Sequence, residues 1–181
     1  MIIHINSYAG VGKLTIATVL VERIGAKLLD NHSIYNVAFA LTEFRSKDFY
    51  DTVRAVRDIA YQRVLELPAE VPVILTNWYS QDSDWGHENW DEIIALAHKR
   101  GSPLYIVVLS CSPEENARRI QSSGRAAKRK PGDVGTVAAN RNGRALLDRG
   151  GDYLLRLDVT DLSAEAAAEE IRQWLEADKG R

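Results

Sequence analysis

Glycine and lysine residues near the start of the chain carry its strongest chemical signal. Gly10, Gly12 and Lys13 follow a short apolar run and precede a stretch, residues 12–24, whose apolar side chains recur at helical spacing. Glycines allow backbone N–H groups to turn toward an anion, and a helix N-terminus adds the positive end of its dipole. The lysine supplies a charge for the terminal phosphates of a nucleotide. The expected phosphate-binding residues are Ser7, Ala9, Gly10, Val11, Gly12, Lys13, Leu14 and Thr15.

This segment departs from the phosphate-loop pattern G-x-x-x-x-G-K-[ST] at two positions. Ser7 stands where the first glycine is expected, and Leu14 stands where a Mg²⁺-binding hydroxyl is expected, with Thr15 one residue later. The alternative is a glycine-rich turn ahead of an ordinary helix. The segment lies directly between a predicted strand and a predicted helix, and this position favours phosphate binding over the alternative.

Polar residues follow the second and third apolar runs, residues 26–29 and 71–75. Asp30 and His32 follow the second run, and Asn77 and Trp78 follow the third. Ligands of parallel α/β sheets bind beyond the carboxyl ends of the strands, so these residues are candidates for metal and acceptor binding. The alternative is that Asp30 or Asn31 caps the next helix and that His32 is a bystander. Phosphate-loop proteins often carry a metal-binding acid after the third strand, and its absence here shifts metal binding toward Asp30.

Two arginines lie one turn apart in a predicted helix over residues 48–67. Arg54 and Arg57, together with Arg45 and Lys47, could bind an anionic acceptor, because a guanidinium fork matches a carboxylate or phosphate. The alternative is a solvated, charged helix face.

Aromatic side chains gather around a polar segment, residues 80–90, which we expect to be a loop. They are Trp78, Tyr79, Trp85, His87 and Trp90. Such a group can form the wall of an acceptor pocket, a partner surface or local packing.

A second expected loop, residues 121–135, contains glycines and the basic residues Arg125, Lys128, Arg129 and Lys130. Arg119 precedes it, and Arg141 and Arg144 follow it. Arginines that close over a nucleotide stabilise the charge that phosphoryl transfer spreads over the γ-phosphate, and closure excludes water. We therefore predict a lid. The alternatives are a nucleic-acid-binding loop and a solvated loop.

The remaining elements give the fold class. Apolar runs, including residues 104–109 and 153–157, alternate with helical stretches expected at residues 33–41, 48–67 and 89–100, after Pro113, and at residues 163–177. This alternation predicts a single α/β domain whose parallel strands are buried on both faces.

Composition narrows the functional classes. The chain has 181 residues, of which 45% are hydrophobic and 27% charged, with a formal net charge of −2. This balance makes nucleic acid an unlikely main partner, and the single cysteine excludes an internal disulfide. With no apolar run long enough to span a membrane, we expect a cytoplasmic protein without a membrane partner.

The segment Gly10 to Thr15 resembles the phosphate loop of the nucleoside-monophosphate-kinase-like branch of P-loop kinases, where adenylate kinases also place the hydroxyl one residue later. Shikimate kinases, gluconate kinases and chloramphenicol phosphotransferase belong to this branch. The resemblance implies a three-layer αβα P-loop domain with a five-stranded parallel sheet in the order 2-3-1-4-5 and a lid segment. It also implies an acceptor-binding segment over residues 33–66.

The resemblance further implies residue roles. Asp30 would orient a Mg²⁺-bound water, and His32 would contact the acceptor, either as a base or only by hydrogen bonding. Thr15 would lie on the α-phosphate and metal side. Arg119 or Arg125 would contact adenine or phosphate, and Arg141 or Arg144 would reach the transferring group. The turn at Asp158 and Thr160 resembles one expected near adenine, although Asp161 and Ser163 could simply cap the last helix.

The first functional hypothesis is a small-molecule kinase, monomeric or homodimeric, that transfers the γ-phosphoryl group of ATP to a hydroxyl or phosphate with Mg²⁺. The second is a nucleotide-binding ATPase or switch that acts on a protein or RNA partner. The third is a degenerate phosphate-loop protein that binds no nucleotide.

Overall fold

The predicted strands form one parallel sheet. The computed structural model describes residues 1–121 and 144–178. Its strands pair in parallel in the order β2-β3-β1-β4-β5, which confirms the predicted fold class and strand order. They are β1 (Ile2–Ser7), β2 (Lys27–Asp30), β3 (Val73–Asn77), β4 (Leu104–Ser110) and β5 (Tyr153–Asp158).

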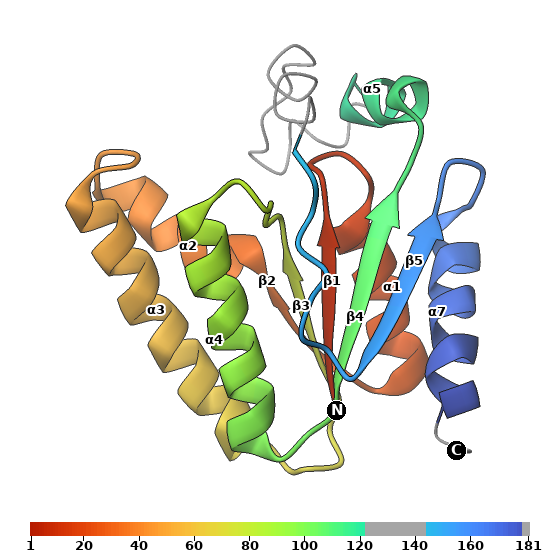
Figure 1. The fold of residues 1–181 in the computed structure, drawn as a ribbon, viewed down its shortest axis with the longest axis horizontal. Helices are drawn as coiled ribbons and strands as arrows, with labels where there is room; N and C mark the ends of the chain where they lie inside the picture. Colours follow the sequence, from red (N-terminus) through yellow and green to blue (C-terminus); the bar gives the residue numbers. More distant parts are fainter. Residues whose placement is uncertain (122–143, 179–181) are drawn as a thin grey trace.

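Helices cover both faces of the sheet (Figure 1). One layer consists of α1 (Lys13–Ile24) and α7 (Ala164–Asp178), which share a core with β1 and β4. On the other face, α4 (Asp84–Arg100) and the end of α3 (Lys47–Glu66) pack against the same sheet. No helix among the described residues has the length and apolar composition needed to cross a bilayer.

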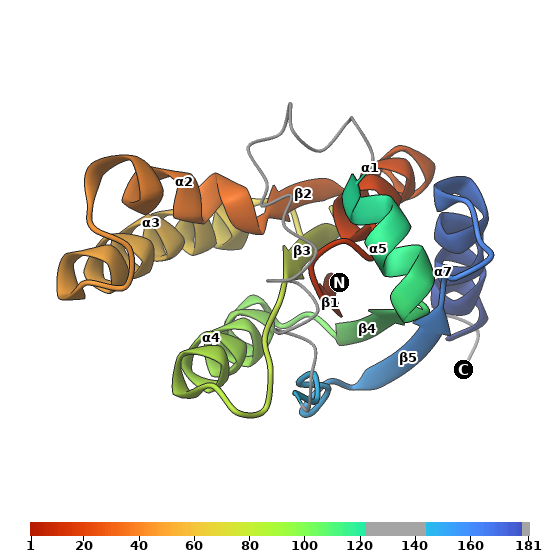
Figure 2. The ribbon, with the colours of Figure 1, turned by 90° about the horizontal axis from the view of Figure 1, so that it is seen from above.

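Two further features lie outside these layers. α2 (Asn31–Leu41) and α3 form a hairpin that projects beyond β2 and has a small core of its own around Phe49 and Val53 (Figure 2). α5 (Pro113–Gln121) lies above the carboxyl end of the sheet, and Pro113 occupies its first turn as predicted (Figure 1).

The outer strands differ from the prediction that all strands are buried on both faces. The central strands β1 and β3 are buried at every position. Most residues of β2 and β5 are partly or fully exposed, and Tyr153 and Leu154 are among the exposed large apolar residues. The two strands form the edges of the sheet, so each lacks a neighbouring strand on one side.

The helix starts follow their capping residues. The Asp30 carboxylate accepts a hydrogen bond from the His32 backbone, which starts α2 two residues earlier than predicted. Ser83 accepts from the backbone N–H of Gly86, so α4 starts at Asp84 and not at residue 89. Residues 84–90 are therefore helical, and the predicted loop over this part of the chain is wrong.

Candidate functional site

The backbone of the phosphate loop has the conformation that its glycines permit. Gly10 has φ +91° and Gly12 has φ +109°, both in the left-handed region that favours glycine. Gly12 forms the N-cap of α1, and its carbonyl accepts the first helical hydrogen bond, from Ile16 at 3.0 Å. Val11 between the two glycines is fully buried and anchors the loop on the core. The loop therefore joins a buried strand to a helix N-terminus, where backbone N–H groups can bind an anion.

Helix α5 packs against this loop. The side-chain amide of Asn116 donates a hydrogen bond to the Ala9 carbonyl at 3.0 Å. A Cβ atom on Gly10 would lie 2.6 Å from both the Asn116 amide nitrogen and the Ile120 side chain, closer than real Cβ contacts. Gly10 is thus required both by its backbone conformation and by the approach of α5.

The two departures from the phosphate-loop pattern have visible local consequences. Ser7 is buried at the end of β1, and its hydroxyl donates to the Tyr8 carbonyl at 3.0 Å. The Lys13 ammonium donates to the Ser7 carbonyl at 3.4 Å, so it folds back over the loop. Leu14 is half-buried, whereas the Thr15 side chain in the first turn of α1 is exposed. Thr15 is therefore the accessible hydroxyl of this turn.

Arg119 on α5 connects the phosphate loop to the turn after β5. Its guanidinium donates to the Val11 carbonyl at 2.7 Å and to the Val159 carbonyl at 2.6 Å, and its Nε donates to Glu115 at 2.5 Å. The same guanidinium lies 3.3 Å from the Thr160 carbonyl. Arg119 thus lies between the two segments that the resemblance assigns to nucleotide binding.

The turn after β5 is held by its own side chains. The Thr160 hydroxyl accepts a hydrogen bond from the Ser112 backbone at 2.9 Å, and the Thr160 N–H donates to Asp158 at 2.8 Å. Ser163 accepts from the Ala166 N–H at 3.1 Å, which confirms the predicted cap of the last helix.

Asp30 is bonded on both of its carboxylate oxygens. Oδ1 accepts from the Thr76 hydroxyl at 2.6 Å, and Oδ2 accepts from the His32 N–H at 3.2 Å. The helix-capping alternative is thus confirmed, and the cap also fixes the orientation of the carboxylate. Each oxygen retains a further lone pair, so capping leaves Asp30 able to accept another hydrogen bond. Asp30 and His32 are both half-buried.

A buried polar chain continues from Asp30 across the carboxyl end of the sheet. The Asn77 amide donates to the side-chain oxygen of Asn31 at 2.9 Å and to the Tyr79 hydroxyl at 3.0 Å. Its oxygen lies 3.1 Å from Nε2 of His4 on β1. Burial lowers the pKa of His4 to about 3, so the ring is neutral and donates from Nε2. Sequence reasoning missed His4, and its only signal was a histidine inside an apolar run.

Arg54 and Arg57 both bind side chains of α4, and the Arg54 side chain remains 40% exposed. Arg54 is bound in a bidentate ion pair by Glu88 of α4, with both nitrogen–oxygen distances 2.8 Å. Arg57 is only 5% exposed, and its guanidinium donates to the Asn89 side-chain oxygen at 2.9 Å. The two arginines therefore join α3 to the first turns of α4.

The aromatic residues divide into core and site. Tyr79 and Trp90 are buried in the core under α4, where the Trp90 ring contacts His4 edge-to-face. For these two residues the local-packing alternative is confirmed. Trp85 lies in the first turn of α4, and its indole N–H donates to the Tyr35 hydroxyl of α2 at 2.8 Å. The indole N–H of Trp78 is buried and has no hydrogen-bond partner within residues 1–121 and 144–178.

The chain returns to the site at residue 144. The Tyr8 hydroxyl donates to the Arg144 carbonyl, and the Arg144 side chain pairs with Asp82 at 3.0 Å. Asn6 at the end of β1 donates to the carbonyls of Tyr79 and Leu147, both at 2.9 Å. These bonds fix the returning chain beside the phosphate loop. Apart from Gln121, the predicted lid lies outside the described residues, as do Arg125 and Arg141.

The predicted site segments lie at the carboxyl end of the sheet. The loops and turns after β1, β2, β3 and β5 all follow the carboxyl ends of parallel strands (Figure 1). Among the described residues, no group of three or more His, Cys, Asp or Glu side chains is arranged to hold a metal ion.

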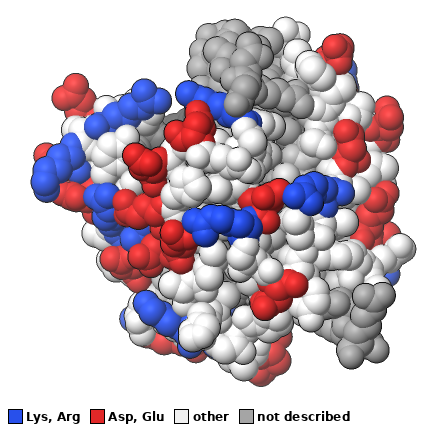
Figure 3. All heavy atoms as spheres, in the orientation of Figure 1, with Lys and Arg blue, Asp and Glu red and all other residues white. Residues whose placement is uncertain are grey.

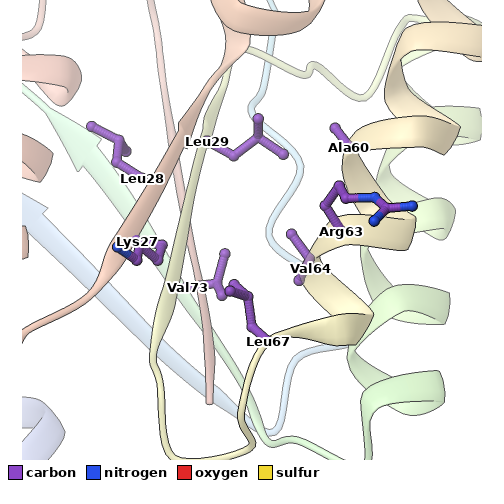
Figure 4. Close-up of a pocket in the computed structure, with 8 residues that line it drawn as sticks. All are labelled: Lys27, Leu28, Leu29, Ala60, Arg63, Val64, Leu67 and Val73. Atoms are coloured by element: carbon purple, nitrogen blue, oxygen red, sulfur yellow. The ribbon is translucent and has the colours of Figure 1, made fainter.

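Two pockets lie away from the carboxyl end of the sheet. One, of about 270 Å³, opens between the start of β2 and the end of α3 and is lined by apolar side chains such as Leu29, Val64 and Leu67 (Figure 4). The other, of about 550 Å³, lies at the amino ends of β4 and β5. None of the predicted site residues lines either pocket.

Comparison with solved structures identifies the fold. A candidate kinase from Chloroflexus aurantiacus superposes with a TM-score of 0.68 at 19% identity, covering 97% of this chain and 96% of that one. The tunicamycin resistance protein of Deinococcus radiodurans gives 0.62 at 22% identity, covering 96% and 94% of the two chains. Shikimate kinase from Acinetobacter baumannii, solved with shikimate, gives 0.59 at 15% identity, with coverage of 99% and 95%.

Sequence comparison adds nothing to this likeness, because no protein-family model and no curated sequence matches the chain significantly. The structural neighbours include kinases over nearly the whole length of the chain. The fold is therefore that of the P-loop kinases of the nucleoside-monophosphate-kinase-like type, as the resemblance of the phosphate loop predicted.

Proposed function

We propose that this P-loop domain is an ATP-dependent phosphotransferase that moves the γ-phosphoryl group to a small-molecule acceptor. The observation that carries the proposal is the backbone of the phosphate loop. Gly10 and Gly12 both have left-handed backbones, and Lys13 begins the helix that follows a buried strand. This arrangement provides backbone N–H groups, a helix dipole and a lysine cation for a triphosphate.

Each part of the site has a task in this reaction. The loop amides and Lys13 would hold the β- and γ-phosphates, and Arg119 would bind the nucleotide between the loop and the turn after β5. Arg125, Arg141 and Arg144 would stabilise the charge on the transferring group. Closure of the lid segment would exclude water, which otherwise hydrolyses ATP.

In this proposal the residues that follow β2 activate the acceptor. Asp30 is oriented by Thr76 and by its helix cap, and His32 lies in the first turn of α2. A half-buried imidazole can accept the proton of an acceptor hydroxyl near neutral pH. Asn77 and Trp78 after β3 would complete the acceptor side, together with Arg54 and Arg57.

The oxygen donors near the loop fit a magnesium ion held largely through water. Asp30 retains lone pairs for a metal-bound water, and the exposed Thr15 hydroxyl is accessible. When bound, Mg²⁺ would neutralise charge on the β- and γ-phosphates. Leu14 and Asn77 replace a hydroxyl and an acid that would otherwise contribute direct ligands.

Calorimetric titration of Mg-ATP and Mg-ADP tests the proposal. We expect binding to the wild type and its loss in Lys13→Ala, because that change removes the cation over the phosphates. Lys27→Ala is the matched control, since Lys27 is an exposed lysine at the amino end of β2, away from the loop. Unchanged affinity in Lys13→Ala would refute the proposal.

Turnover assays separate the alternatives. ADP release that depends on an added small molecule supports the kinase. Slow ATP hydrolysis that ignores such molecules but rises with RNA or a protein supports a nucleotide-dependent switch. Failure of the wild type to bind either nucleotide supports a degenerate phosphate-loop protein.

A further inference from the structure

The side chain of Thr76 near the end of β3 holds the Asp30 carboxylate. Thr76 is fully buried, and the register of the sheet places it beside Asp30, the last residue of β2. Its hydroxyl donates to Oδ1 of Asp30 at 2.6 Å, and its oxygen accepts a longer bond from the Asn31 backbone N–H at 3.4 Å. A hydroxyl has a single proton to donate, so this bond leaves Thr76 no donor for a ligand. Any contribution of Thr76 to the site therefore acts through Asp30 and the first turn of α2.

The Asp30 carboxylate is fixed from two sides. Thr76 bonds Oδ1 from the sheet, and the His32 N–H bonds Oδ2 from the helix. Because the two donors belong to different elements, rotation of the carboxylate about its Cβ–Cγ bond would disrupt both bonds. The first turn of α2 has a second attachment to β3, since the Asn77 amide donates to the Asn31 side chain at 2.9 Å. The carboxylate therefore has one preferred orientation before any ligand arrives.

The charge of Asp30 is not neutralised by a cation in the part of the chain that the structure describes. Acidic and basic side chains are interspersed over α3 and α4 (Figure 3), and several of them pair, as Glu88 does with Arg54. Within residues 1–121 and 144–178, by contrast, Asp30 forms no ion pair, and both of its hydrogen-bond donors are neutral. An oriented carboxylate with lone pairs to spare suits a water molecule bound to a cation.

We infer that Thr76 is a positioning residue, which holds Asp30 in the orientation that binds a magnesium-bound water. This inference rests on the proposed function, in which Asp30 orients that water, and it adds a residue that the sequence did not indicate. Phosphate-loop proteins often carry a metal-binding acid after the third strand, whereas β3 of this chain ends in Thr76 and Asn77. Here β3 supports the acid of β2 and supplies none of its own.

Calorimetric titration with and without metal tests the inference. The non-hydrolysable ATP analogue AMPPNP is titrated with Mg²⁺ and again with EDTA. The dissociation constant with EDTA, divided by that with Mg²⁺, gives the metal ratio, which measures how much the metal tightens binding. Thr76→Val removes the hydroxyl and keeps the branched shape. We expect it to lower the metal ratio toward one, by as much as about tenfold, as is usual when a partner that orients a metal-site group is lost.

Affinity in EDTA should not change in Thr76→Val, because the phosphate loop itself is untouched. Thr76→Ser keeps the hydroxyl and should keep the metal ratio of the wild type. An unchanged metal ratio in Thr76→Val would overturn the inference.

Two further variants separate positioning from a general loss of structure. Thr42→Val removes a hydroxyl that donates to the Ala38 carbonyl at 2.7 Å, at the other end of α2, and should leave the metal ratio unchanged. Asp30→Asn keeps a helix-capping side chain and removes the charge, so adding Thr76→Val to it should lower the metal ratio no further. An equal fall in Thr42→Val, or a full additional effect in the Asp30→Asn background, would contradict the assigned role.

Hydrogen exchange provides a readout that needs neither metal nor nucleotide. The backbone N–H groups of Asn31 and His32 bond to Thr76 and Asp30, so Thr76→Val should speed their exchange in the nucleotide-free protein. Thr42→Val should leave these two groups unaffected. Unchanged exchange in Thr76→Val would mean that Asp30 keeps its orientation without Thr76, against the inference.

Nucleotide binding distinguishes the two possible failures. If AMPPNP binds in a Lys13-dependent manner but the metal ratio is one in the wild type or does not depend on Thr76, this inference fails while nucleotide binding stands. If the wild type binds no nucleotide, the proposed function fails and the inference fails with it.

Discussion

Replacing Gly10 by alanine is a direct test of the phosphate-loop geometry. A left-handed backbone costs an alanine about 1–2 kcal/mol. The new Cβ would lie 2.6 Å from the Asn116 amide and from Ile120 Cγ1, and both of these residues are buried on α5. Relief of such overpacking costs about 1–3 kcal/mol. We therefore expect Gly10→Ala to lower the free energy of unfolding by about 2–5 kcal/mol in total.

Gly25→Ala is the matched control for this experiment. Gly25 has φ +65°, and a Cβ there would meet nothing within 4 Å, so only the backbone cost of about 1–2 kcal/mol applies. Urea denaturation of both variants measures the unfolding free energies, and their difference isolates the collision with α5. Calorimetry should also show that Gly10→Ala weakens Mg-ATP binding and that Gly25→Ala does not.

Equal destabilisation by the two substitutions, with Mg-ATP affinity retained in Gly10→Ala, would refute this reasoning. It would mean that α5 moves away from the loop at negligible cost and that the loop does not depend on the close contact.

Two further substitutions probe the site. The pKa of His4 falls from 6.5 to about 3 on folding, so between these values only the unfolded chain takes up the proton. Stability should therefore fall as the pH drops from 6.5 toward 3, by about 1.4 kcal/mol per unit, and His4→Gln should remove this part of the slope in urea denaturation at several pH values. Arg119→Ala should weaken Mg-ATP binding by about tenfold, whereas Arg118→Ala should not, because Arg118 is exposed and pairs with Glu115.

The contrary outcomes are equally specific. An identical pH slope in His4→Gln would show that the buried imidazole titrates normally. Equal Mg-ATP affinities of Arg119→Ala and Arg118→Ala would remove Arg119 from the nucleotide site.

The sequence alone determined the features that depend on local chemistry. Gly10, Gly12 and Lys13 marked the phosphate loop, because a left-handed backbone and a helix N-terminus are properties of a few adjacent residues. The alternation of apolar runs and helical stretches gave the class of fold, and the resemblance of the loop to a known branch gave the strand order. The capping roles of Asp30 and Ser163 were also accessible as alternatives, since a cap bonds to a backbone group two or three residues away.

Only the tertiary structure decided which side chains meet across the fold. Arg54 and Glu88 are 34 residues apart, His4 and Asn77 are 73 apart, and Arg119 and Val11 are 108 apart. No local pattern encodes such pairs, because they form only when the packing of strands and helices brings distant segments of the chain together. For this reason two arginines that suggested an anionic acceptor from sequence are, in the folded chain, bound by the Glu88 carboxylate and the Asn89 side-chain amide of α4.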